Sequence, residues 1–144
     1  MESIAVFVNG SEDAAASLEF GAHEAAIRKA TLRLVAAWDV PSSILGGGVA
    51  GREVYEEFRE TAENLIKEAV AKVSVLEPDV AVETRVVKGQ PGPVFLEESR
   101  DAALIVAARK RHPGIKELVL GSVSKHIISN AERPVVVVPL VPRS

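Results

Sequence analysis

The chain has 144 residues, close to the commonest size of a single domain, and 47% of them are hydrophobic. Its net charge of −3 provides no general attraction to nucleic acid or anionic lipid, so we expect neither as a partner. The absence of cysteine excludes disulfide scaffolds, thiolate catalysis and cysteine-ligated zinc. The first residues lack a signal-peptide pattern, and no apolar run approaches the roughly 20 residues that span a bilayer. We therefore expect a cytoplasmic protein.

Five short segments have the composition of β-strands. Four are mostly apolar without alternation, which is typical of parallel strands that are covered on both faces. The fifth, Ala81–Val87, alternates apolar and polar side chains and is expected nearer an edge of the sheet. The four apolar segments are Ile4–Val8, Leu32–Trp38, Ala103–Ala107 and Val135–Val138.

Helical patterns lie between these segments. The first helix is expected from Ser11, a suitable N-cap, to about Lys29. The second is the clearest, because apolar residues recur at spacings of three and four and Pro78 blocks its continuation. A third helix is expected to begin at Pro91 and a fourth after Gly121. The apolar stripe of the second helix consists of Val54, Phe58, Ala62, Leu65, Ile66, Ala69, Val70 and Val73.

The alternation of strands and helices predicts a single-domain α/β fold with a five-stranded, mostly parallel, doubly wound sheet over residues 1–139. Residues 140–144 are expected to form a C-terminal tail, which looks like part of a thrombin-cleavage linker but could also be native. Pro41–Gly51 contains three consecutive glycines and is predicted to be a mobile loop. In such a sheet, ligands bind at the carboxyl ends of the strands. This places the candidate site around residues 9–11, after Trp38, and around residues 108–122.

Five segments together resemble the universal stress protein family over the full length of the chain. Each is weak alone, but five in the same order and at family spacing are specific. The resemblance implies the three-layer α/β/α arrangement of the adenine nucleotide alpha hydrolase-like fold and a role in the stress response. The segments are VNGS at 8–11, LRLVAAWDVP at 32–41, VVKGQP at 86–91, LGSVS at 120–124 and AERPVVVV at 131–138.

The nucleotide-binding motif of that family is only partly present. In nucleotide-binding members, the fourth strand is followed by G-x2-G-x9-G-[ST], whose glycines let backbone N–H groups approach phosphates. The last pair is retained here as Gly121-Ser122, at a helix start that favours anions. The earlier glycines correspond to Ala108 and Arg111, and the family's common Asp after the first strand is Asn9.

These changes leave two interpretations of the loop Arg109-Lys110-Arg111-His112. Its side chains could bind phosphate in place of the missing glycines, or it could be a solvated charged loop without a ligand, which we favour because such charge runs are common. Ala37 matches the place where the family offers backbone groups to adenine. The candidate cofactor-binding residues are Asn9, Ala37, Ala108, Arg109, Arg111, Gly114, Gly121, Ser122, Val123 and Ser124.

No catalytic or metal-binding group is predicted. Ser122 lies one helical turn before His126, but no carboxylate is placed to orient that histidine, so a capping serine and a surface histidine are favoured. The three histidines lie in separate segments without metal-ligand spacing.

The segment Val135–Val138, bracketed by two prolines, is an edge strand by its position. In the resembled family this strand pairs across a two-fold axis, so the resemblance implies a homodimer through Val135–Val138. The alternative is a strand covered by its own C-terminal tail.

Three functions remain open. The first is a cytoplasmic, homodimeric stress protein that acts by binding partners, with degraded or absent ATP binding. The second is an ATP or AMP sensor with slow or no hydrolysis. It would hold phosphates through Gly121-Ser122, Arg109 and Arg111, with magnesium, for which Asn9 is a poorer ligand than Asp. The third is a pocket for a different small molecule at the same place.

Overall fold

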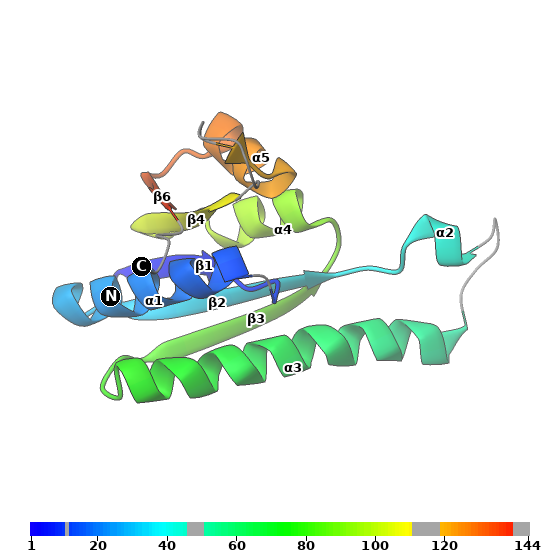
Figure 1. Cartoon of the computed structure of the whole chain (residues 1–144), viewed down its shortest axis with the longest axis horizontal. Helices are drawn as coiled ribbons and strands as arrows, with labels where there is room; N and C mark the ends of the chain where they lie inside the picture. Colours follow the sequence, from blue (N-terminus) through cyan, green and yellow to red (C-terminus); the bar gives the residue numbers. More distant parts are fainter. Residues whose placement is uncertain (11, 46–50, 111–118, 140–144) are drawn as a thin grey trace, which may run out of the picture.

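The computed structural model describes residues 1–10, 12–45, 51–110 and 119–139, which form one α/β sheet structure (Figure 1). Its elements in chain order are β1 (Ser3–Phe7), α1 (Glu12–Arg28), β2 (Thr31–Trp38), α2 (Ser42–Leu45), α3 (Arg52–Leu76), β3 (Val82–Lys88), α4 (Pro91–Glu98), β4 (Leu104–Lys110), β5 (Val119–Leu120), α5 (Ser122–Asn130) and β6 (Val135–Val138).

The sheet is doubly wound, as predicted. Five strands run parallel in the order β3-β2-β1-β4-β6, and β5 adds a two-residue antiparallel pair at the end of β4. The winding direction reverses between β1 and β4, so the carboxyl ends of these two strands form the switch point. The edge position of β3 is confirmed. β5 was not predicted, because two residues carry no recognisable pattern.

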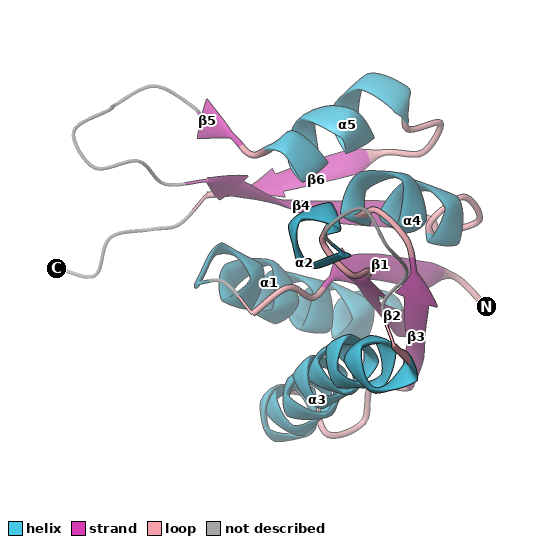
Figure 2. Cartoon of the chain, turned by 90° about the vertical axis from the view of Figure 1, so that its right-hand side faces the viewer, coloured by secondary structure: helices cyan, strands magenta, loops and turns pink. Residues whose placement is uncertain are grey.

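Helices cover both faces of the sheet and give the predicted three layers (Figure 2). α1 and α3 pack on one face over the larger core, which includes Ile4, Leu34 and Val106. α4 and α5 pack on the other face, where Phe95 and Ile127 are buried. The apolar stripe of α3 faces the sheet as expected from its spacing. Its buried members are Ala62, Ile66, Ala69 and Val73.

One local prediction needs correction, and parts of two predictions fall on residues outside the described ranges. The segment predicted as a loop, Pro41–Gly51, contains the one-turn helix α2, whereas residues 46–50 lie outside the described ranges. The predicted N-cap Ser11 also lies outside them. None of the helices in the described part of the chain combines the length and the apolar character needed to cross a membrane.

The second strand is not the uniform apolar run that the sequence analysis assumed. Arg33 lies within β2, and its side chain is only 4% exposed. A buried charge is unfavourable unless it is paired. Arg33 meets this requirement through ion pairs with Glu83 at 2.9 Å and Asp101 at 2.6 Å.

Candidate functional site

Four of the predicted site residues line one pocket at the switch point. Asn9 comes from the end of β1, Ala108 from β4, and Val123 and Ser124 from the first turn of α5. The pocket has a volume of about 50 Å³. The topology therefore brings these four residues together as expected for a doubly wound sheet.

The turn after β1 depends on a glycine. Gly10 has φ of 78°, a left-handed conformation that L side chains rarely adopt. A Cβ at position 10 would also lie 3.0 Å from Cδ2 of Leu65 in α3. The left-handed Gly10 thus bends the chain after β1, and Asn9 is exposed at the mouth of the pocket.

The hydroxyl of Ser124 is used inside the protein. Its Oγ donates a hydrogen bond of 2.8 Å to the carbonyl oxygen of Ala108, and Ser124 is 9% exposed. The bond joins the first turn of α5 to the carboxyl end of β4. A ligand that needed this hydroxyl would have to break a hydrogen bond at a site with little access to water.

The floor of the pocket is aromatic. The rings of Phe7 and Phe95 lie 5.4 Å apart at an angle of 40°, and Phe95 is 1% exposed. Ala14 and Ser17 of α1 complete the wall on the other side. The sequence analysis named none of these four. The spacing of three between Ala14 and Ser17, just after the first strand, could have indicated that both face the site, whereas nothing in the sequence connects Phe7 with Phe95.

The space between the described lining residues of the pocket is small. Ligand pockets usually have volumes of roughly 300–1,000 Å³, whereas this one has about 50 Å³. That space accommodates a few water molecules.

Three other predicted residues, Arg109, Gly121 and Ser122, lie next to the pocket in sequence but are not among the residues that line it. Gly121 is the N-cap of α5, with φ of −69° and ψ of 167°, and no side-chain cap is present there. The prediction of a capping Ser122 is therefore wrong: this serine is the first helical residue and is exposed. Arg109 lies in β4 opposite Leu120, while Arg111 and Gly114 lie outside the described residues.

Ala37 lies near the end of the second strand, as expected, whereas His126 is placed differently from the expectation. Ala37 pairs with Val87 near the carboxyl end of β2 and does not line the pocket. His126 is half-buried rather than a surface histidine. Its ring packs against α4, where a Cβ at Gly92 would lie 3.1 Å from the ring carbons Cγ and Cδ2.

A second cluster at the same edge of the sheet was missed. Trp38 ends β2 and forms an edge-to-face pair with Tyr55 of α3, with 6.5 Å between the ring centroids. Nζ of Lys88, at the end of β3, lies 4.6 Å from the Tyr55 centroid and 6.0 Å from that of Trp38. These are cation–π contacts. They attach the first turns of α3 to the sheet beside the candidate site (Figure 1).

Comparison with known proteins gives consistent results in sequence and structure. A model of the universal stress protein family matches residues 1–139. The universal stress protein Rv2624c of Mycobacterium tuberculosis is 30% identical over 137 residues, which are 95% of this chain and 48% of that protein. The chain thus spans about half or less of the length of the curated relatives it matches.

Solved structures show the same fold. A universal stress protein from Archaeoglobus fulgidus has a TM-score of 0.73 at 24% identity, with 96% of this chain and 98% of that chain covered. A universal stress protein in complex with cAMP has a TM-score of 0.65 at 20% identity, with 95% of each chain covered. These structures show that the fold is shared, and the match of the family model over residues 1–139 shows that the chain belongs to the universal stress protein family.

Proposed function

We propose that the protein is a cytoplasmic homodimer that acts in the stress response by binding partner proteins, and that its binding of adenine nucleotides is weak or absent. The observation that carries this proposal is the small pocket of about 50 Å³ at the switch point. Phe7 and Phe95 occupy its floor, and the Ser124 hydroxyl is bonded to the Ala108 carbonyl.

The altered motif supports the same conclusion. Glycines in the family motif let phosphates approach the bare backbone. At the first of these positions Ala108 has a side chain, and its carbonyl oxygen accepts the Ser124 hydrogen bond. Phosphate binding would then depend on Gly121-Ser122 at the N-terminus of α5 and on the side chains of Arg109 and Arg111.

The edge strand β6 supports the homodimer. In the described part of the chain it pairs with β4 alone, and its four valines are half-buried. Val135, Val136 and Val138 pack against the two cores. Pairing with a second copy would cover the remaining edge, which would otherwise be a site of uncontrolled strand pairing.

Val137→Asp is the sharpest test of the dimer. Val137 is half-buried in β6 but is not among the residues packed against either core, so the change spares more of the fold than Val136→Asp would. Size-exclusion chromatography with light scattering should give a dimer for the natural chain and a monomer for the variant. Ile128→Asp, on the exposed side of α5, is the matched control and should remain a dimer. A monomeric natural chain, or a Val137→Asp variant that stays dimeric, would exclude this interface.

A nucleotide sensor is the second candidate, and the solved relative in complex with cAMP favours it. Isothermal titration with ATP and AMP, with and without magnesium, separates the two functions. Micromolar binding that is weakened by both Ser122→Ala and Arg111→Ala would support the sensor. Absence of binding at millimolar ligand, with an unchanged melting temperature, would support the partner-binding dimer.

A further inference from the structure

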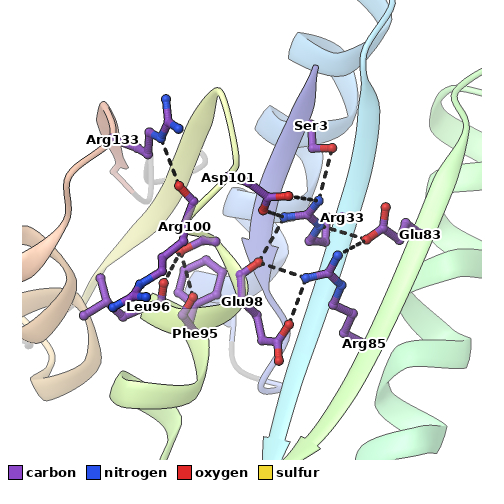
Figure 3. A network of polar contacts seen from close by, with 11 residues as sticks. Ser3, Arg33, Glu83, Arg85, Phe95, Leu96, Glu98, Arg100, Asp101 and Arg133 are labelled. Carbon is purple, nitrogen blue, oxygen red and sulfur yellow. Dashed lines mark hydrogen bonds and ion pairs between the residues drawn. The ribbon is translucent and has the colours of Figure 1, made fainter. Parts of the chain in front are cut away.

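The buried Arg33 is the centre of a charged cluster (Figure 3). The cluster lies toward the amino ends of the strands, whereas the pocket lies at their carboxyl ends. Its Nε donates to Glu83 of β3 at 2.9 Å, and its Nη1 donates to Asp101, in the turn before β4, at 2.6 Å. Its Nη2 reaches Ser3 of β1 at 3.4 Å. One guanidinium therefore connects three strands of the sheet with the turn that leads into a fourth.

The same cluster holds the C-terminal end of α4. Nη1 of Arg33 donates to the backbone carbonyl of Glu98 at 3.0 Å, and Nη1 of Arg85 donates to the Glu98 carboxylate at 2.8 Å. Arg85 also pairs with Glu83 at 2.7 Å. Positive charge at a helix C-terminus is stabilising because it faces the negative end of the helix dipole.

The buried positive charge of Arg33 depends on the carboxylates around it for compensation. The charged groups around Arg33 are Glu83 and Arg85 on β3, Glu98 on α4 and Asp101 before β4. Arg33 is 4% exposed, whereas the Asp101 side chain is 71% exposed. The hydrogen bond from Arg33 lowers the pKa of Asp101. The anchoring of the buried guanidinium thus relies on a carboxylate that solvent can reach, and its loss would leave a buried charge partly uncompensated.

α4 connects this cluster with the helix of the candidate site. The helix begins at Pro91, at the carboxyl edge of the sheet, and runs back to Glu98 at the amino edge. At its start, buried Gly92 lies directly against His126 of α5. Farther along, Phe95 and Ile127 belong to the same buried core. Because this contact tolerates little extra volume, a movement of α4 toward α5 must displace His126.

We propose that one charged cluster fixes α4 on the sheet and, through the contact between Gly92 and His126, sets the position of α5. The cluster consists of Arg33, Glu83, Arg85, Glu98 and Asp101. Loss of the Asp101 charge, by acid or by substitution, weakens the interactions by which this cluster holds α4. The consequence then appears at the opposite edge of the sheet, where α5 begins at Ser122. This coupling does not depend on whether the site binds a nucleotide.

Hydrogen–deuterium exchange of the full chain at pH 7 tests this proposal. Asp101→Asn keeps the size of the side chain but removes its charge, and Asp79→Asn, in the exposed turn before β3, is the matched control. We expect amides of α4 and α5 to exchange roughly tenfold faster in Asp101→Asn, which corresponds to one lost charged hydrogen bond. Amides of α1, α3 and β2 that exchange through local openings, in which the cluster stays intact, should be unchanged in both variants. Glu98→Gln weakens the ion pair between Glu98 and Arg85 and should give the same pattern.

Two other patterns would overturn the proposal. Faster exchange confined to residues 98–103 would mean that the cluster acts locally. An equal increase over the whole sheet would mean that it contributes only to global stability. The ring signals of His126 in an NMR spectrum give an independent readout. They should shift in Asp101→Asn and not in Asp79→Asn, and unchanged signals in both would exclude the coupling.

Discussion

Replacing Asp101 by Ala should destabilise the protein at neutral pH and have a smaller effect in acid. The substitution removes the 2.6 Å ion pair to Arg33, which is 4% exposed. The remaining acceptors of Arg33 are Glu83, the Glu98 carbonyl and the Ser3 hydroxyl. Breaking a buried pair completely costs roughly 3–5 kcal/mol. A charged hydrogen bond contributes about 1.5–3 kcal/mol. Because Glu83 stays in place, and because solvent screens the Asp101 carboxylate, which is 71% exposed, we expect a loss near the low end of these ranges, about 2 kcal/mol in the free energy of unfolding.

The pH dependence follows from the lowered pKa of Asp101, whose largest cause is the hydrogen bond from Arg33. The pKa of an Asp side chain is about 3.9 in the unfolded state. A carboxyl group whose pKa is lower in the folded state stabilises the fold at pH values above the unfolded-state pKa. This contribution disappears as the pH falls through the folded-state pKa. The difference between Asp101→Ala and the natural chain should therefore be constant from pH 7 to pH 5 and decrease below about pH 4.

Urea unfolding followed by circular dichroism measures this difference at each pH. The expected 2 kcal/mol corresponds to a decrease of about 6 °C in the melting temperature. Asp79→Ala, which changes an exposed carboxylate in a turn, is the control and should stay within about 0.5 kcal/mol of the natural chain. Equal stabilities of Asp101→Ala and the natural chain at pH 7, or a difference that does not decrease as the pH falls below about 4, would refute the reasoning.

Three further substitutions test the site. Phe95→Ala removes a ring that is 1% exposed and should cost about 3–5 kcal/mol in urea unfolding, so a cost below about 1 kcal/mol would show that the pocket floor is not packed. Ser124→Ala leaves the Ala108 carbonyl without its 2.8 Å donor and should cost about 1–2 kcal/mol, whereas an unchanged midpoint would show that the bond does not form in solution. Lys88→Met removes the cation from the rings and should cost about 0.5–1 kcal/mol. It should also change the emission of Trp38, the only tryptophan, and an unaltered spectrum would contradict this contact.

The fold was largely predictable from the sequence, because apolar strand segments and the regular spacing of apolar residues in a helix indicate which residues are buried. The strand Val135–Val138 and the stripe of α3 were found at the expected positions. Arg33 was missed because its neighbours in β2 are apolar, and its partners Glu83 and Asp101 lie 50 and 68 residues away in sequence. Only the folded sheet brings these charges together.

The candidate site was predictable in position but not in shape. The switch-point rule correctly placed Asn9, Ala108 and the start of α5 together. The pairing of Phe7 with Phe95 and the hydrogen bond from Ser124 to Ala108 are contacts between distant segments, and a motif cannot reveal them. Whether these residues bind a ligand stays a prediction.

Native mass spectrometry of the purified chain, sprayed with and without millimolar AMP and ATP, tests the central claim most directly, because one spectrum reports both assembly and nucleotide. We expect a species of twice the 15.3 kDa chain mass, with no nucleotide retained beyond the level of a non-binding control protein. A monomer, or a dimer that carries one stoichiometric nucleotide for each chain, would contradict the proposed nucleotide-independent dimer.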